Sequence, residues 1–220
     1  MDGFVTIVSG LPRSGTSMMM KMLDAGGLSV VVDNLRAPDE DNPGGYYEFE
    51  KVKDIRADNS WLGEARGKVC KMVSQLLYDL PPGLDYKVVF MERNLSEMAA
   101  SQRKMLVRLG RGAEAGSDED MLRQYEAHLG KIKGWLAGQP NIAVLYVSYN
   151  AVMADPRGEA VRVAGFLGGG LDVDKMAGVL DSSLYRNRAE GPQTATAPSV
   201  EVAEEDEEAV KERLKSLGYL

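Results

Sequence analysis

The sequence predicts an α/β fold of three layers, in which a central parallel sheet is flanked by helices. Two observations carry this prediction. Short apolar runs alternate with segments of helical length and spacing, which favours parallel strands joined by crossover helices. The chain has 220 residues, of which 44% are hydrophobic, enough to bury the core of one full domain.

The first part of the chain gives the clearest strand and helix. Residues 4–9 are a short apolar run typical of a buried strand, and residues 16–24 have helical spacing up to a glycine pair. The methionines of this helix are expected to pack in the core. Residues 34–47 are polar and rich in glycine and proline, which indicates a long loop.

The later segments continue the alternation. We expect strands at residues 68–73, 86–92 and 142–147. We expect helices at residues 48–58, 74–79, 96–109 and 118–137, and helical turns up to residue 167. Residues 1–188 are therefore predicted to form one α/β domain. Residues 189–220 are predicted to be a linker (189–203) and a charged C-terminal helix (204–217) that packs on or near the same domain.

Composition narrows the class of protein. A net charge of −7 argues against nucleic-acid binding, which needs a basic surface. There is no apolar run of about 20 residues and no signal peptide, so we expect a cytoplasmic protein without a membrane span. The single cysteine, Cys70, fits a reducing compartment. The single histidine, His128, argues against a histidine-built metal site or a Ser-His-Asp triad, and we expect it at the surface.

The loop "SGLPRSGTS" between the first strand and the first helix predicts an anion site. Its backbone N–H groups converge on one point, and the helix N-terminus adds partial positive charge there. Gly10 and Gly15 have the spacing of a Walker-type nucleotide-binding loop, but Thr16 replaces the lysine and a cation comes earlier, at Arg13. Such a loop suits a ligand that places a single phosphate on it. The alternative is a tight turn with ordinary helix capping by Ser14 or Thr16.

A second candidate site follows the strand at residues 86–92. Arg93 comes directly after this strand, and Ser101 lies eight residues later in the next helix. Ligands of open α/β sheets bind beyond the carboxyl ends of the strands, and a guanidinium and a hydroxyl together suit a phosphate. The alternative is a strand-ending arginine in a surface ion pair.

Together the two stretches resemble the sulfotransferases that use 3′-phosphoadenosine 5′-phosphosulfate (PAPS), as a bacterial-type member. In that family a loop of the form P-K/R-S-G-T-S/T binds the 5′-phosphosulfate, and an Arg and a Ser eight residues apart bind the 3′-phosphate. The matching residues are Pro12, Arg13, Ser14, Gly15, Thr16 and Ser17 in the loop, then Arg93 and Ser101. The likeness continues in "VLYVSYNAVMADPRGEAVRVAGFLG", "NPGGYYE" and "SSLYRNR", so it spans most of residues 4–188.

The resemblance implies a P-loop nucleotide-binding fold, PAPS as cofactor, adenosine 3′,5′-bisphosphate as product, and no metal. PAPS has no β- and γ-phosphates, which accounts for the missing lysine. Arg13, with the N–H groups of residues 14–17, would stabilise the leaving phosphate. The chain departs from the family in having Asn94-Leu95 where Asp-Pro is common. It also lacks a recognisable glycine-rich C-terminal loop, for which Arg186 or Arg188 would be a loose replacement.

Glu48 is the candidate general base. It follows a pair of glycines in a segment that resembles the branches of the family that use a glutamate, and His128 has no matching position. Glu50 is a rival, and the alternative is that Glu48 is only a helix-start residue favoured by the dipole. Lys71, at the end of a predicted strand, either faces the sulfate or is an ordinary exposed lysine.

We therefore expect a PAPS-dependent sulfotransferase that acts on a hydroxyl or amine of an unidentified acceptor: a sugar, lipid, peptide or small molecule. One alternative is a degenerate P-loop nucleotide kinase or hydrolase, with its lysine supplied from elsewhere and Glu92 near magnesium. The other is a non-catalytic nucleotide-binding domain of the same fold.

Overall fold

The computed structural model describes residues 3–33, 35, 45–108, 110, 117–180, 212 and 214. The chain divides into two compact units. The first unit comprises Met1–Glu92 and Pro140–Leu184, and the second comprises Arg93–Gln139 and Tyr185–Leu220. The predicted linker, and the predicted C-terminal helix apart from Glu212 and Leu214, lie outside the described residues. The domain boundary at residue 188 therefore stays a prediction.

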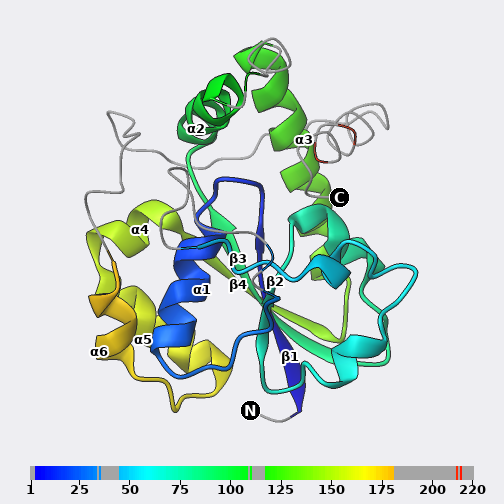
Figure 1. The fold of residues 1–220 in the computed structure, drawn as a ribbon, viewed down its shortest axis with the longest axis vertical. Coiled ribbons are helices and arrows are strands. Elements are labelled where there is room, and N and C mark those ends of the chain that lie inside the picture. The colour runs from blue at the N-terminus through cyan, green and yellow to red at the C-terminus, as the bar shows by residue number, and fades with distance from the viewer. Residues whose placement is uncertain are drawn as a thin grey trace. The chain divides into compact units, whose positions relative to one another are not determined.

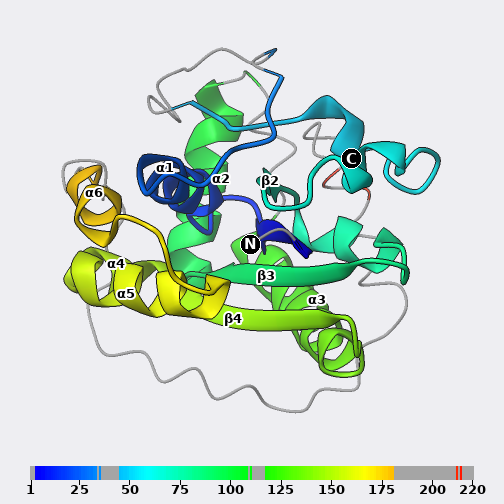
Figure 2. The same ribbon diagram turned by 90° about the horizontal axis from the view of Figure 1, so that it is seen from below.

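A four-stranded parallel sheet is the centre of the first unit (Figure 1). Its strands are β1 (Phe4–Gly10), β2 (Val69–Lys71), β3 (Asp85–Glu92) and β4 (Ile142–Ser148), in the order β2-β1-β3-β4. The register pairs Val8 with Lys71 and Gly10 with Met91. Figure 2 shows β3 and β4 side by side. Because all the strands are parallel, their carboxyl ends meet at one edge of the sheet.

Four α-helices in the described part of the first unit accompany this sheet: α1 (Thr16–Ala25), α4 (Tyr149–Ala154), α5 (Pro156–Leu167) and α6 (Val173–Gly178). Side-chain caps start the last three, since Ser148, Asp155 and Asp172 each accept a hydrogen bond from a backbone N–H of the first turn. Helix α6 lies beside α1 (Figure 1). The described residues of this unit also form three short 3₁₀ helices: Glu50–Val52, Ser60–Gly63 and Ser74–Asp79.

The core of the first unit forms where β1 and α1 bury their apolar side chains. Val5, Ile7 and Val8 of β1 are fully buried. In α1 the fully buried residues are Met19, Met20, Met22 and Leu23, so three of the four methionines of this helix pack in the core as predicted, whereas Met18 is half-buried.

The second unit contains two described helices, α2 (Leu95–Arg108) and α3 (Asp118–Ala137). Ser117 caps α3 by accepting a hydrogen bond from the N–H of Asp120. His128 is fully buried, so the expected surface position is wrong. The reason is periodicity: the buried residues of α3 recur every three or four positions and His128 is one of them, with Met121, Tyr125, Ile132 and Leu136.

The predicted fold class is confirmed: a central parallel sheet is flanked by helices. The four predicted strands are present, and α1, α2 and α3 lie within a residue of their predicted bounds. The segment at residues 74–79 is helical as predicted, but of the 3₁₀ type. Among the described residues, no helix is both long and apolar enough to cross a membrane.

The predicted helix at residues 48–58 is wrong. Only Glu50–Val52 is helical, as a single 3₁₀ turn followed by further turns. Tertiary hydrogen bonds hold the start of this segment extended: the N–H of Asp33 donates to the carbonyl of Glu48, and the N–H of Glu50 donates to the Asp33 carboxylate at 2.6 Å. Glu48 therefore precedes the helical turn and is not a helix-start residue.

Candidate functional site

The loop between β1 and α1 has the tight backbone that its two glycines predict. Gly10 has a φ of 149°, and a Cβ there would lie 2.6 Å from the carbonyl oxygen of Met91. Gly15 has a φ of 100°, and a Cβ there would lie 2.5 Å from Cδ2 of Tyr149. Any side chain at either position would collide with its neighbour, so the loop geometry requires both glycines.

No side chain caps the start of α1. The N-cap is Gly15 itself, and it has no side-chain hydrogen bond, so capping by Ser14 or Thr16 is wrong. The first N–H groups of an α-helix have no partner within the helix, so they are donors to an anion. The N–H of Ser14 differs, because it donates to the carbonyl of Leu11 at 3.2 Å and closes the loop.

Two loop side chains add to this candidate anion site. The hydroxyl of Ser14 is fully buried and has no hydrogen-bond partner among the described residues. A buried hydroxyl of this kind costs free energy until a partner arrives. Arg13 has a φ of 71°, a left-handed conformation that is uncommon for a residue with a side chain. Pro12 is buried and Thr16 is half-buried.

Lys71 brings a cation to the start of α1 from the end of β2. Its Nζ lies 3.5 Å from Oγ of Ser17 and 3.5 Å from Oε1 of Glu48, and it also donates to the carbonyl oxygen of Tyr46. The ring of Tyr46 lies 5.9 Å from the same ammonium. Only 12% of the Lys71 side chain is exposed, so the interpretation as an ordinary exposed lysine is wrong.

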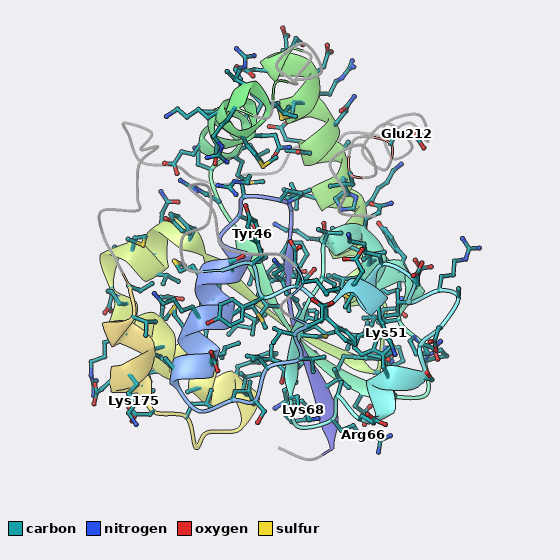
Figure 3. All side chains as sticks on the ribbon, in the orientation of Figure 1. Tyr46, Lys51, Arg66, Lys68, Lys175 and Glu212 are labelled. Atoms are coloured by element: carbon teal, nitrogen blue, oxygen red, sulfur yellow. The ribbon has the colours of Figure 1, made fainter. Side chains whose placement is uncertain are left out.

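The burial of Lys71 differs from that of four other cations of the first unit. Lys51, Arg66, Lys68 and Lys175, which Figure 3 labels, are all exposed. Tyr46 lies near the start of α1 in the same view, where its carbonyl accepts a hydrogen bond from Ser17 at 3.3 Å. We call Ser17, Tyr46, Glu48 and Lys71 the lysine cluster.

The two candidate bases have different surroundings. Glu48 belongs to the lysine cluster, and 19% of its side chain is exposed. Glu50 has 56% of its side chain exposed and pairs with Lys53 at 2.7 Å. The structure thus brings Glu48, and not Glu50, to the cation beside the candidate phosphate loop.

Sequence reasoning missed the residues that fix the segment carrying Glu48. Tyr47 has a φ of 51°, and its hydroxyl donates to Asp24 of α1 at 3.2 Å. Burial and the nearby Asp24 carboxylate raise the pKa of Tyr47 to about 12, so it stays a neutral donor. Tyr149, which packs against Gly15, was also missed. Tyr149 begins α4 directly after β4. A correct prediction of which strands pair would therefore have been enough to place it near this loop.

Arg93 and Ser101 belong to the second unit and form a separate group of candidates. Nε of Arg93 donates to Oε2 of Glu97 at 2.9 Å, and only 9% and 2% of these two side chains are exposed. Arg93 does form an ion pair, as the alternative predicted, but the pair is buried and does not lie at the surface. Ser101 lies within α2, as predicted, and is buried.

Asn94 explains how the chain tolerates its departure from Arg-Asp-Pro. Its side-chain oxygen accepts a hydrogen bond from the N–H of Glu97 at 2.9 Å, and its carbonyl accepts one from the N–H of Met98. Asn and Asp are equivalent N-caps, and Leu95 fills the first helical position where proline is common. Helix α2 therefore starts directly after Arg93 in spite of the substitution. Arg186 and Arg188 lie outside the described residues.

Known protein families and solved structures provide a comparison that is independent of this geometry. A family model described as the sulfotransferase domain matches residues 5–213. No curated protein sequence matches the chain significantly. A solved structure, the sulfotransferase domain from the curacin biosynthetic pathway, is 14% identical with a TM-score of 0.52, and the alignment covers 97% of this chain and 98% of that one. At this identity the solved structure shows a shared fold only. The family match covers most of the sequence, and the chain therefore belongs to the sulfotransferase domain family.

Proposed function

We propose that this chain transfers a sulfuryl group from PAPS to a hydroxyl or amine of an acceptor. Membership of the sulfotransferase domain family supports a sulfotransferase activity in general. One observation carries the proposal further: Lys71 reaches from β2 to Ser17 at the start of α1 and stands beside Glu48. A phosphate loop, a cation and a carboxylate thus belong to one group of residues.

The loop suits the 5′-phosphosulfate end of PAPS. The uncapped N–H groups at the start of α1 and the helix dipole favour an anion there. The buried hydroxyl of Ser14 lacks a partner among the described residues, and a phosphate oxygen would supply one. Arg13 adds a charge-assisted donor from the same loop.

Bound at this loop, PAPS would supply an activated sulfuryl group whose sulfur–oxygen bond to phosphate breaks, with the electron pair staying on adenosine 3′,5′-bisphosphate. Glu48 takes the proton of the acceptor's hydroxyl or amine as the acceptor atom bonds to sulfur. Arg13 and the first N–H groups of α1 stabilise the charge that develops on the leaving phosphate. Lys71 stabilises charge on the sulfuryl oxygens.

Arg93 and Ser101 are proposed to bind the 3′-phosphate. A guanidinium offers a planar fork of donors for phosphate oxygens, and the hydroxyl adds one more. A second phosphate contact would let the protein distinguish adenosine 3′,5′-bisphosphate from nucleotides that carry phosphate only at the 5′ position.

The acceptor is open to a sugar, a lipid, a peptide or a small molecule, because the loops that would recognise it carry no readable code. For the location we retain the cytoplasm, since Cys70 is a buried free thiol that fits a reducing compartment. The kinase or hydrolase alternative requires a lysine from outside the loop and a carboxylate at the end of a strand. Lys71 and Glu92, at the end of β3, are the candidates for these two roles. The family match favours the sulfotransferase.

Nucleotide binding measured by calorimetry and thermal shift tests the proposal. We expect adenosine 3′,5′-bisphosphate to bind more tightly than adenosine 5′-phosphate and to stabilise the fold more than ATP with magnesium. Arg93→Ala should erase the preference for the 3′-phosphate and leave adenosine 5′-phosphate binding intact. A stronger response to ATP with magnesium would favour the kinase or hydrolase, and no response to any nucleotide would contradict nucleotide binding by this chain.

Activity is tested by incubating the chain with PAPS and one acceptor of each class. Release of adenosine 3′,5′-bisphosphate that depends on an acceptor is the expected result. Tight binding of the nucleotide without release for any acceptor would contradict the proposed transfer.

A further inference from the structure

We infer that Glu97 is a positioning residue that holds the guanidinium of Arg93 in the orientation that the 3′-phosphate needs. The inference rests on the proposed function, because it assigns a role to a partner of the proposed 3′-phosphate arginine. All the contacts that carry it lie within the second unit, in the first turn of α2 and the two residues before it.

The first observation is the bond itself. Nε of Arg93 and Oε2 of Glu97 are 2.9 Å apart, and the two side chains are 9% and 2% exposed. A guanidinium carries five N–H groups in one plane, and this bond uses the one on Nε. Holding Nε fixes the plane of the whole group, so the direction of its other donors is set by Glu97.

The second observation is that Glu97 is itself fixed by the backbone. Its N–H donates to the side chain of Asn94 at 2.9 Å, and the N–H of Met98 donates to the carbonyl of Asn94 at 3.0 Å. Glu97 thus occupies the third position of a capped helix, where a glutamate side chain points back toward the residues before the helix. Arg93 is the residue immediately before the cap, so helix α2 orients the arginine through this carboxylate.

The third consideration is energetic. Two charges buried this deeply lose most of their hydration, and a buried ion pair often stabilises a fold no more than apolar residues of similar size would. A contribution to fold stability is therefore a weak explanation for the presence of this ion pair. Orientation of a ligand-binding fork is a stronger one, since a misdirected guanidinium binds phosphate as a point charge only.

The experiment measures the ratio of the dissociation constants for adenosine 5′-phosphate and adenosine 3′,5′-bisphosphate by calorimetry. Glu97→Gln keeps the size of the side chain but removes its charge. We expect the ratio to fall about tenfold or more, the loss that follows when a charge-assisted contact is no longer held in place, with unchanged affinity for adenosine 5′-phosphate. Glu159→Gln is the matched control, because it removes the carboxylate of another intrahelical ion pair, Glu159–Arg162 in α5, and should leave the ratio unchanged.

Two further variants sharpen the test. Arg93→Lys keeps the positive charge without the planar fork, so it should lower the ratio as Glu97→Gln does. It also keeps the inference testable if Glu97→Gln fails to fold. The double variant Arg93→Ala with Glu97→Gln should have the same ratio as Arg93→Ala alone, because Glu97 acts through Arg93.

The outcomes separate the inference from the proposed function. If Arg93→Ala keeps the wild-type ratio, the 3′-phosphate role of Arg93 fails and the role of Glu97 with it. If Arg93→Ala erases the preference while Glu97→Gln and Arg93→Lys retain it, only the positioning role is overturned. A higher ratio in Glu97→Gln would also overturn it, since Glu97 would then compete with the phosphate for the arginine.

Discussion

Arg13 holds a left-handed backbone conformation, with a φ of 71°. This conformation costs a residue with a Cβ about 1–2 kcal/mol, and glycine adopts it without that cost. An arginine at this position therefore lowers local backbone stability but supplies a cation to the candidate phosphate loop. The backbone also decides which variant tests the side chain most cleanly.

Replacing Arg13 by glycine should weaken nucleotide binding without destabilising the fold. Loss of the guanidinium removes a charge-assisted hydrogen bond worth about 1.5–3 kcal/mol, so the affinity for adenosine 3′,5′-bisphosphate should fall and transfer should slow. Stability in urea should be unchanged or higher, because glycine relieves the left-handed strain. Calorimetry and urea unfolding measure the two effects, and full affinity in the variant would contradict the role of Arg13.

Glu48 is the residue whose removal should most affect transfer. Glu48→Gln keeps the contact with Lys71 possible but cannot accept a proton, so the rate should fall about 10²–10⁴-fold while nucleotide affinity changes little. Glu50→Gln is the matched control, since Glu50 is exposed and pairs with Lys53. The measurement is sulfate transfer from PAPS to an acceptor found in the screen, and a dead Glu50→Gln beside an active Glu48→Gln would reverse the assignment.

The sequence was informative about the residues of the loop and less so about their partners. The spacing of Gly10 and Gly15 follows from chain-local geometry, so it could be read directly. The place of Lys71 depends on β2 pairing with β1 in a register that puts Lys71 opposite Val8. Strand order and register are set by packing over the whole sheet, and a three-residue strand carries little of that information.

At the scale of elements, the long apolar strands and the amphipathic helices were predictable because their periodicity reflects burial on one face. The helix prediction for residues 48–58 failed because the carbonyl of Glu48 and the N–H of Glu50 both bond to Asp33, which is distant in sequence, and the remaining bonds form only short turns. Helix α6 was not predicted, and at six residues it is too short to give a periodic signal. It is capped by Asp172, whose N–H also donates to the carbonyl of Gly26 at the end of α1.

The loop before α1 depends on the close approach of Tyr149 to Gly15. Gly15→Ala should lower both fold stability and nucleotide affinity, because the new Cβ meets Cδ2 of Tyr149 at 2.5 Å and also strains a φ of 100°. Gly27→Ala is a matched control at the other end of α1: its φ is 94°, but nothing lies within 4 Å of the new Cβ.

The two glycine variants should therefore differ in their nucleotide affinity as well as in the size of their stability loss. Gly27→Ala should lose about 1–2 kcal/mol of stability and keep its nucleotide affinity. Gly15→Ala should lose more stability, and its nucleotide affinity as well. Urea unfolding and calorimetry give the comparison, and equal nucleotide affinity in both variants would mean that the loop tolerates displacement.

At the scale of the whole molecule, the chain passes from the first unit to the second after Glu92 and returns at Pro140. The phosphate loop and the lysine cluster belong to the first unit, and Arg93 with Ser101 begins the second. The order of these motifs along the sequence was enough to suggest the family, which the match over residues 5–213 then confirmed. The crossings after Glu92 and Gln139 carry no shift in composition, so the division into two units could not be predicted from the sequence.

Stability of the whole molecule should fall in alkaline solution. Burial raises the pKa of Cys70 from 9.0 to about 12, and that of Tyr86 from 10.0 to about 12. Burial and the carboxylate of Asp24 raise the pKa of Tyr47 from 10.0 to about 12. The folded chain keeps these protons at a pH at which the unfolded chain releases them, so the stability they contribute is complete below about pH 9 and is lost as the pH rises toward 12.

Urea unfolding at pH 8 and pH 11 measures this effect. The free energy of unfolding should be lower at pH 11, and Tyr86→Phe should reduce the difference because it removes one of the three groups. The variant will also lose the hydrogen bond to the carbonyl of Pro81, which lowers its stability at both pH values alike. An equal free energy at the two pH values in the wild-type chain would show that these groups titrate normally.

The buried thiol of Cys70 gives the unmodified protein a chemical reporter of its own motions. It is the only cysteine in the chain, it is fully buried in β2, and its Sγ lies 3.9 Å from the carbonyl of Thr6. Alkylating reagents attack the thiolate, so modification requires that the sheet edge open and expose the sulfur. The rate of alkylation therefore measures how often β2 opens. Because the next residue is Lys71, a nucleotide that binds at the lysine cluster should slow the reaction, and the measurement needs neither a label nor a substitution.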